Sequence, residues 1–411
     1  MTTAFEANES QPPTRRPVDR QRRVLLMGAG GASCIPVLDY TVTGLTLLCV
    51  LVLPGVLVHR MSTGFRAPVL TAAMGCAAYA VSAEVNDVHG YEPNRLVYAS
   101  IVVYLMAFGL CCRDVGDVCV ILVGISMGTV VFALVVGTPL SDTGSFADLW
   151  KYGIANAVTV VLVFVLVTAG TSARLVGLCL VVLAVVSLAL NYRSHALVCV
   201  IVAVVVALGA NVDPRRSVAA AAAAVVGFGV LLPVVSGAGI FGDALAGKVS
   251  AQEGEGVPLI LAGRTESPLS LTAIGERPFL GWGSATAVPE RVFAEARLLA
   301  VDLGFSPRFP FQYTWRGPEN SASFHSVLLG SWAEGGVVAA LFPLWLLAMC
   351  VLVVTWSRRV GRWAPLVCVV AVQAAWDLLF SPWTYNLPAV LAAVAVLCVV
   401  TRGTRRGTVP S

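Results

Sequence analysis

Apolar blocks, each about as long as a membrane-spanning helix, follow one another along most of this chain. A bilayer core of about 30 Å is crossed by roughly 20 apolar residues in a helix. Hydrophobic residues make up 57% of the 411 residues and charged residues only 12%, whereas a soluble domain carries about 25% charge. Because so few charged side chains cannot cover a globule, the sequence predicts an all-α polytopic membrane protein.

We expect about twelve transmembrane helices, together with one long loop that contains short helices. The first, at residues 24–36, is short and rich in glycine, and Ala32-Ser33-Cys34 faintly resembles a lipoprotein cleavage site. Another apolar block follows at once, so we interpret these residues as a weak first span. The others are expected at residues 38–59, 67–83, 96–112, 117–137, 153–170, 173–190, 195–211, 217–235, 336–356, 364–380 and 385–400.

The basic residues in the connections predict the orientation of these helices, because cytoplasmic loops are rich in Lys and Arg. Outside the long loop, one side carries only Arg95, Lys151 and Arg193. We therefore place both termini in the cytoplasm and the long loop outside, in a membrane that the Arg-rich and Ala-rich composition suggests is bacterial. The residues assigned to the cytoplasmic side are Arg15, Arg16, Arg20, Arg22, Arg23, Arg60, Arg66, Arg113, Arg174, Arg215, Arg216, Arg358, Arg359, Arg362, Arg402, Arg405 and Arg406.

The long loop divides the chain into five predicted segments. These are a disordered basic tail at 1–23, nine transmembrane helices at 24–235, an extracytoplasmic loop with the candidate catalytic residues at 236–335, three transmembrane helices at 336–400 and a basic tail at 401–411.

Two helices are expected around the candidate residues of the loop. Residues 289–300 place apolar side chains on one helical face, as in an amphipathic helix that lies on a membrane surface. A second helix, capped by Asn320 or Ser321, is expected to carry His325 and to bend at Gly335-Gly336.

Several classes of function lose support because their motifs are missing. No Walker-type Gly-Lys-Ser loop and no HExxH motif is present, which argues against ATP coupling and metal-dependent hydrolysis. The eleven cysteines lie in or beside apolar blocks and form no CxxC pair, as expected of small buried hydrophobic residues. The formal net charge of +4 does not indicate a nucleic-acid partner. We therefore expect no metal site and no cofactor.

Four polar residues on the extracytoplasmic side are candidates for chemistry. Arg193, between two spans, is either an interfacial anchor or an anion clamp, because a guanidinium binds phosphate in a planar, two-pronged geometry. Arg264 and Glu266 form either a structural ion pair or part of the same site. His325 is either a packing residue or a general base, because imidazole exchanges a proton near neutral pH.

Five short motifs follow one another along the chain. They are Tyr192-Arg193-Ser194, Gly263-Arg264, Pro278-Phe279-Leu280-Gly281-Trp282-Gly283, His325-Ser326 and Glu334-Gly335-Gly336. In order, spacing and membrane side they resemble the motifs of the O-antigen ligase and polymerase superfamily of integral-membrane glycosyltransferases, over residues 155–355. Tyr192 stands where that family has a small hydroxyl residue, and Ser326 where it has Asn.

The resemblance implies transfer of a glycan from a polyprenyl-pyrophosphate carrier in the membrane lipid to a hydroxyl of a glycan or glycolipid acceptor. Arg193 and Arg264 would then stabilise the pyrophosphate leaving group, and His325 would take the acceptor proton, with Glu266 or Glu334 orienting these groups. The loop aromatics either stack on sugar rings or lie at the membrane interface. The candidate substrate-binding residues are Gly281, Trp282, Gly283, Tyr313, Trp315 and Glu334.

Alternatives remain within and outside this family. A ligase attaches finished chains to an acceptor, whereas a polymerase joins repeat units on the carrier, and the sequence does not separate the two. A transporter of polysaccharide or lipid-linked sugar would need a polar path, and the spans contain few charges, with Asp39 and Asp377 near their edges. A structural partner of a cell-envelope complex is the remaining alternative.

Overall fold

The computed structural model describes residues 17–38, 41–55, 63–90, 93–138, 145–208, 214–238, 264–317 and 320–403. Within these ranges the chain is almost entirely helical, and each predicted span from residue 38 onward overlaps a helix. These helices are α2 (Gly44–Val52), α4 (Arg66–Val85), α5 (Pro93–Cys111), α6 (Val115–Val135), α8 (Ala155–Thr168), α9 (Ala173–Ala189), α10 (Arg193–Ala207), α11 (Pro214–Gly237), α18 (Leu341–Trp356), α19 (Ala364–Phe380) and α20 (Leu387–Gly403). The agreement is poorest for the span predicted at 38–59, where the helix has only nine residues and follows a short strand, Val42–Thr43.

In the part of the chain that the structure describes, six helices are long and apolar enough to cross a membrane. A seventh span results if α17 (Val327–Ala339) and α18, which meet at an angle of 109°, are taken together. The all-α membrane architecture is therefore confirmed, but the number twelve stays a prediction. Helices α9, α10 and α20 are apolar but contain only 17, 15 and 17 residues.

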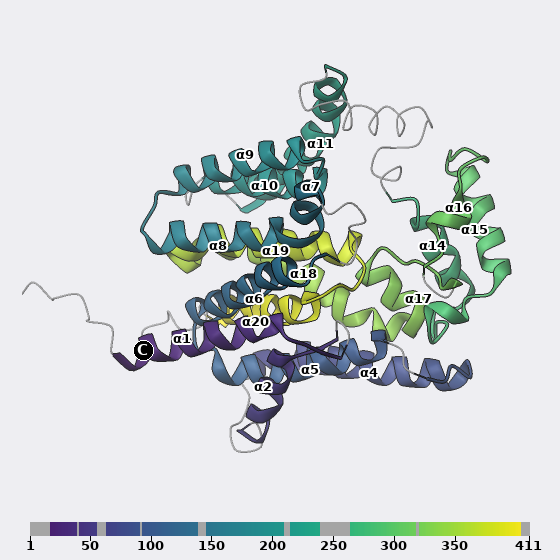
Figure 1. Ribbon diagram of the computed structural model, residues 1–411, viewed down its shortest axis with the longest axis horizontal. Coiled ribbons are helices and arrows are strands. Elements are labelled where there is room, and N and C mark those ends of the chain that lie inside the picture. The colour runs from purple at the N-terminus through teal and green to yellow at the C-terminus, as the bar shows by residue number, and fades with distance from the viewer. Residues whose placement is uncertain are drawn as a thin grey trace, which may run out of the picture.

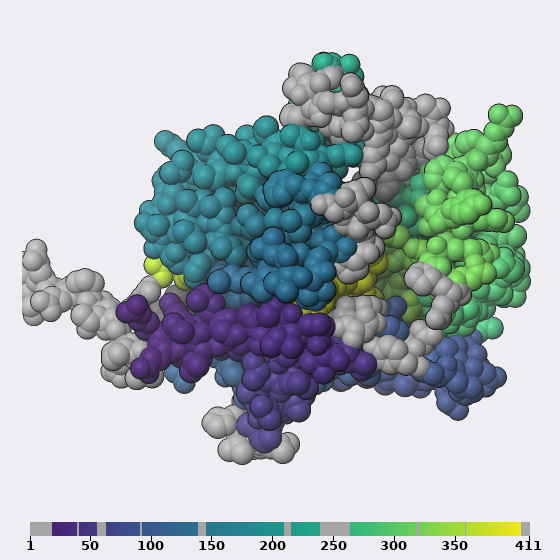
Figure 2. All heavy atoms as spheres, viewed as in Figure 1, coloured from purple at the N-terminus to yellow at the C-terminus, as the bar shows by residue number. Residues whose placement is uncertain are grey.

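Most of these helices run side by side along the long axis of the molecule (Figure 1). The start of α1 (Pro17–Gly31) and the end of α20 lie at one end of this bundle. The long-loop helices α14 (Ser267–Glu276), α15 (Glu290–Asp302) and α16 (Phe311–Thr314) lie at the other. The space-filling view shows the same division, with α14 to α16 gathered at one end and α1 along one side (Figure 2).

The long-loop helices have an apolar core of their own. Helix α15 confirms the amphipathic helix predicted at 289–300, and Val292 and Ala296 on its apolar face are fully buried. This face packs into a protein core with Leu269 and Ala273 of α14, so the prediction that it lies on a membrane surface is wrong. Amphipathic periodicity shows that one face is buried, but it does not show whether lipid or protein covers that face.

The bend predicted at Gly335-Gly336 is present at Gly336, whose φ of 73° interrupts the helical backbone. The start of this helix differs from the prediction. Helix α17 begins at Val327, and its N-cap is Ser326, whose hydroxyl accepts a hydrogen bond of 3.1 Å from the Leu329 amide. His325 therefore lies just before the helix, in an extended segment, and Asn320 and Ser321 do not cap it.

The N-terminal helix also begins earlier than predicted. Residues 17–23, assigned to a disordered tail, form the first turns of α1, which ends at Gly31. A short 3-10 turn, Ala32–Cys34, and an antiparallel pair of strands, β1 (Pro36–Leu38) and β2 (Val42–Thr43), then lead into α2. The weak first span is thus a helix of 15 residues that is displaced toward the N-terminus.

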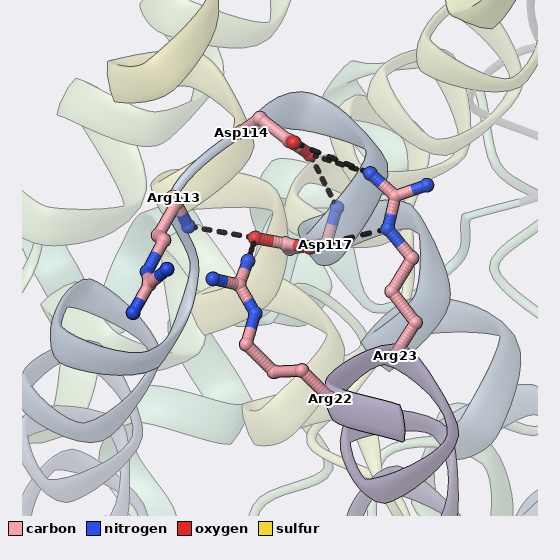
Figure 3. A network of polar contacts seen from close by, with 5 residues as sticks. All are labelled: Arg22, Arg23, Arg113, Asp114 and Asp117. Carbon is pink, nitrogen blue, oxygen red and sulfur yellow. Dashed lines mark hydrogen bonds and ion pairs between the residues drawn. The ribbon is translucent and has the colours of Figure 1, made fainter. Parts of the chain in front are cut away.

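Ion pairs at the N-terminal end of α6 explain why α1 begins earlier than predicted (Figure 3). Asp117, whose side chain is only 1% exposed, pairs with Arg22, and its Oδ1 lies 3.4 Å from Arg23 Nε. The Arg113 amide donates a hydrogen bond of 2.9 Å to Asp117 Oδ2. The second carboxylate, Asp114, lies 3.2 Å from Arg23 Nη2. A buried carboxylate needs such partners, and α1 supplies them from residues that the charge pattern alone assigns to a solvated tail.

Glycines let α1 and α6 approach closely. A methyl group at Gly30 would lie 2.6 Å from the Ile121 carbonyl oxygen and 3.0 Å from the Cα of Gly124. Gly124 and Gly128 are four residues apart on α6, the small-residue spacing that brings helix backbones together in membranes. This contact holds α1 along the bundle below its ion pairs.

Replacing Asp117 with Ala should lower the free energy of unfolding by about 2–3 kcal/mol. Hydrogen bonds to charged groups contribute about 1.5–3 kcal/mol each, and the partial exposure of both arginines reduces their share. Thermal unfolding of the purified protein in detergent measures this loss.

Asp114→Ala is the matched control. Asp114 is exposed and caps α6 through a hydrogen bond of 2.9 Å from the Asp117 amide, so its loss should cost only about 1 kcal/mol. Equal losses in the two variants would contradict the anchoring role of Asp117.

Candidate functional site

Residues from four segments, distant in the sequence, meet at the end of the bundle nearest the long-loop helices. The segments are the turn between α9 and α10, the residues before α14, the residues before α17 and the end of α19. They bring together all four candidate catalytic residues, which are Arg193, Arg264, Glu266 and His325. We call this group, with Tyr192 and Asp377, the outer polar cluster.

His325 is partly accessible to solvent. Its side chain is 40% exposed, and Nδ1 lies 3.4 Å from Glu266 Oε1 and 3.1 Å from Ser323 Oγ. No hydrogen-bond partner of Nε2 is found among the described residues. A carboxylate beside one ring nitrogen orients an imidazole and stabilises its protonated form, which leaves the other nitrogen for proton transfer.

Arg264 lies on a pair of aromatic rings at the end of α19. Its Cζ is 5.2 Å from the centre of the Phe380 ring and 5.8 Å from that of Trp376. Burial lowers the pKa of the Arg264 guanidinium, while the negative charges of Glu266 and Asp377 act in the opposite direction. A guanidinium keeps its proton in proteins, so Arg264 is a half-buried cation whose strength in the site is raised by the loss of water around it.

Arg193 is the first residue of α10 and lies close enough to Arg264 for their positive charges to repel each other. Both side chains are half-buried. Two guanidinium groups together in a partly desolvated place are unfavourable unless anions balance them. The N-terminus of α10 adds the positive end of a helix dipole. Glu266 and Asp377 supply negative charge here, and the partly exposed guanidinium groups have the planar, two-pronged geometry that binds phosphate oxygens.

The sequence analysis missed two members of the outer polar cluster. Asp377, considered only as a charge near a span edge, accepts hydrogen bonds of 3.0 Å from Gln373 Nε2 and 2.8 Å from Ser381 Oγ. Tyr192 was noted only as a departure from a family motif. Burial, with a smaller contribution from Asp377, raises its pKa to about 12. A charged residue at the end of an apolar span is by itself a signal of function, and that signal could have identified Asp377.

Two of the three candidate aromatics of the loop, Trp315 and Tyr313, have opposite environments. Trp315 is buried, and its indole Nε1 donates a hydrogen bond of 2.7 Å to the carbonyl of Thr265, which lies between Arg264 and Glu266. Tyr313 is 88% exposed. Trp315 therefore holds the backbone between Arg264 and Glu266, and of these two aromatic rings only that of Tyr313 is exposed to solvent.

The remaining candidates, Gly281, Trp282, Gly283 and Glu334, form a clasp between two backbone segments. The Trp282 amide donates a hydrogen bond of 2.9 Å to the Ala333 carbonyl, and the Gly283 amide one of 2.7 Å to the Glu334 carbonyl. The Trp282 ring is buried, and its Nε1 donates to the Ala273 carbonyl at 3.0 Å. We call residues 278–283 and 333–337 the clasp.

Glu334 lies on the buried side of the clasp. Both of its carboxylate oxygens accept hydrogen bonds from Asn94 Nδ2, at 3.0 and 2.9 Å, and its carbonyl also accepts one of 2.8 Å from Ser82 Oγ. These contacts join α17 to α4 and α5. The clasp thus attaches the long-loop helices to the bundle, while the outer polar cluster carries the accessible charged groups.

Glycine is required in the clasp for a steric reason. Gly281 has a φ of 70°, and a methyl group there would lie 2.5 Å from the Glu334 carbonyl oxygen. Gly336, with a φ of 73°, is pressed against the carbonyl of Phe279. Gly281 packs against the segment of Gly336, and Gly336 packs against the segment of Gly281. This close packing explains why both motifs contain glycine, and no contact with a substrate is needed.

Comparison of the chain with protein-family models, with curated proteins and with solved structures gives no match. Among the described residues, no group of three or more His, Cys, Asp or Glu side chains is placed to hold a metal ion. The side chains of the outer polar cluster are therefore the structural features that bear on function.

Gly281→Ala should lower the free energy of unfolding by about 2–4 kcal/mol, because the methyl group meets the Glu334 carbonyl and the positive φ is strained. Thermal unfolding and protease cleavage within the long loop measure the effect. The control is Gly275→Ala in α14, where nothing lies within 4 Å of the added methyl group. Equal stability of the two variants would show that the clasp is not rigid.

Trp315→Phe should destabilise the protein by about 1–3 kcal/mol, because the Thr265 carbonyl loses its donor in a buried place. Tyr313→Phe removes only a hydroxyl from an exposed ring and should leave the unfolding temperature unchanged. Thermal unfolding of both variants, run side by side, tests the support that Trp315 gives to residues 264–266. A Trp315→Phe protein with wild-type stability would exclude it.

Proposed function

We propose that this protein is a glycosyltransferase that moves a glycan from a polyprenyl-pyrophosphate carrier to an acceptor hydroxyl. The observation that carries the proposal is the meeting of Arg193, Arg264, Glu266 and His325 in the outer polar cluster. It combines two cations with a carboxylate-oriented histidine. Such a set can stabilise a departing pyrophosphate and accept a proton from the attacking group.

In the proposed reaction, His325 is the general base. The acceptor oxygen attacks the anomeric carbon of the glycan, and its proton passes to Nε2 of His325. The carboxylate of Glu266, 3.4 Å from Nδ1, stabilises the imidazolium that forms. General-base catalysis of this kind contributes about 10²–10⁴-fold in rate.

The bond between the anomeric carbon and the phosphate oxygen breaks at the same time, and its electron pair leaves with the polyprenyl pyrophosphate. Arg193 and Arg264 balance the charge that develops on this leaving group. Their half-buried position increases the electrostatic effect, and the aromatic rings of Trp376 and Phe380 limit the freedom of Arg264. No other cofactor is part of the proposed step.

We further propose that the bundle crosses the cytoplasmic membrane of a bacterium about twelve times, with α9, α10 and α20 as short spans. Both termini would be cytoplasmic and the outer polar cluster extracytoplasmic. Two observations support this orientation. The start of α1 and the end of α20 lie at the opposite end of the bundle from α14 to α16 (Figure 1), and the positive-inside rule places Arg22, Arg23 and Arg113 in the cytoplasm.

The proposed chemistry is the same for a ligase and for a polymerase. The lipid-linked glycans of cells that lack the gene separate the two. Long chains that accumulate on the carrier indicate a missing ligase, whereas single repeat units indicate a missing polymerase. A precursor that stays on the cytoplasmic side would instead favour transport.

His325→Ala should reduce glycan transfer in purified membranes by at least about 10²-fold, because the general base is lost, while the amount of inserted protein stays the same. His89→Ala is the matched control, since His89 is exposed in the connection after α4. Product formation from a lipid-linked glycan is measured by chromatography and protein content by immunoblot. Full activity of His325→Ala would remove this residue from the mechanism.

A further inference from the structure

A second histidine, His195, lies in the bundle directly behind the outer polar cluster. It is two residues after Arg193 on α10, and its side chain is buried. The ring of Tyr192 stacks on it, with centroids 5.5 Å apart and an angle of 20° between the planes. The proposed reaction makes no use of His195, yet its stacking partner Tyr192 belongs to the cluster, and Arg193 follows Tyr192 in the chain.

Both ring nitrogens of His195 have hydrogen-bond partners on other helices. Nδ1 lies 2.7 Å from Ser187 Oγ of α9, and Nε2 lies 2.9 Å from Thr159 Oγ1 of α8. The Cys199 sulfur makes weaker contacts, 3.7 Å from Nε2 and 3.9 Å from Nδ1. The two hydroxyl partners are themselves bonded further along, so the contacts form a chain.

One assignment of protons satisfies every group in this chain. At one end the indole Nε1 of Trp150, which can only donate, gives a hydrogen bond of 3.1 Å to Ser187 Oγ. At the other end Thr159 Oγ1 donates its proton at 2.9 Å to the Ala155 carbonyl, which can only accept. Thr159 then accepts from Nε2 of His195, and a neutral ring accepts at Nδ1 from Ser187. This assignment uses each proton once and places the proton of His195 on Nε2.

The chain also depends on an unusual piece of backbone. Trp150 begins a π-helical turn, Trp150–Ile154, directly before α8. Such turns are rare and often occur at functional sites. Here the turn presents the indole of Trp150 to Ser187, and the ring stands edge-on to His195 with centroids 6.1 Å apart. The imidazole of His195, on α10, therefore links this helix to α9 and to α8 with its π-helical turn.

We propose that His195 is a positioning residue, held in one tautomer by this chain, that fixes the ring of Tyr192 and with it the turn that carries Arg193. The catalytic part of this inference rests on the proposed function. A fixed Arg193 matters most when charge develops on the leaving pyrophosphate, since only interactions that strengthen in the transition state raise the rate of the chemical step. Loosening the chain should therefore lower kcat and leave KM nearly unchanged.

Substitutions at Thr159 test the chain without touching the cluster. Thr159→Val keeps the shape of the side chain but removes the hydroxyl, whereas Thr159→Ser keeps the hydroxyl. We expect kcat per folded protein to fall about tenfold in Thr159→Val, as for a small misplacement of a catalytic group, and to recover in Thr159→Ser. A purely structural role would lower the unfolding temperature of Thr159→Val and leave kcat per folded protein unchanged, which would overturn the proposal.

A second measurement does not depend on any activity. The protein contains nine tyrosines, and with 3-fluorotyrosine incorporated, the ¹⁹F signal of Tyr192 is identified by its loss in Tyr192→Phe. This signal should move or broaden in Thr159→Val and stay in place in Thr159→Ser. If it is unmoved in both, His195 does not position Tyr192.

The tautomer itself can be observed by ¹⁵N NMR of histidine-labelled protein, in which His195 is identified by its loss in His195→Gln. A single neutral form with the proton on Nε2 is expected. A protonated ring, the opposite tautomer or a mixture of the two would overturn the inference.

The two hypotheses can fail separately. If the wild-type protein transfers no glycan, the proposed function fails, and the fluorine and nitrogen spectra still decide whether His195 holds Tyr192. If transfer is normal and neither kcat nor the Tyr192 signal changes in Thr159→Val, the function stands and the positioning role fails. Should Thr159→Val not fold, Ser187→Ala interrupts the same chain at the other nitrogen and replaces it in both measurements.

Discussion

Two guanidinium groups that lie close together at the end of the bundle are the constraint on which the outer polar cluster depends. Arg193 and Arg264 repel each other in a place with little water, so the surroundings must balance their charge. Glu266 and Asp377 supply negative charge, and the rings of Trp376 and Phe380 lie against Arg264. Two carboxylates therefore face two guanidinium groups at this end of the bundle.

A polar group in an apolar bundle needs a partner, and this rule explains contacts at three places in the protein. At one end Asp117 draws Arg22 and Arg23 onto α6 and so turns a basic segment into the start of a helix. Behind the cluster, Ser187 and Thr159 bind the two ring nitrogens of His195. Trp150 and the Ala155 carbonyl end this chain of hydrogen bonds. In the clasp, Asn94 satisfies the carboxylate of Glu334. Each solution joins helices that are distant in the sequence.

The long-loop helices combine independence with a rigid attachment. They bury their own aromatic core around Trp315 and Phe305, and the backbone contacts of the clasp join them to α17 and α4. Trp315 links the two features, because the same buried ring donates to the Thr265 carbonyl beneath the cluster. Of the candidates for sugar binding, Trp315 therefore holds residues 264–266 in position, and Tyr313 is exposed. The others, Gly281, Trp282, Gly283 and Glu334, belong to the clasp.

The sequence by itself determined the helices and their apolar character, because the length of an apolar block and the positions of basic residues are local properties that a bilayer reads directly. It also singled out His325, Arg264, Arg193 and Glu266 as candidates, from their residue types and their positions in and beside the long loop. Only the tertiary structure decided which of these meet, that Asp377 and Tyr192 join them, and that Gly281 and Glu334 belong to a clasp. The sequence predicted the apolar face of α15. It did not predict that protein buries this face, because periodicity does not distinguish lipid from protein. Contacts between segments so far apart depend on how the helices pack, and no local pattern records that packing.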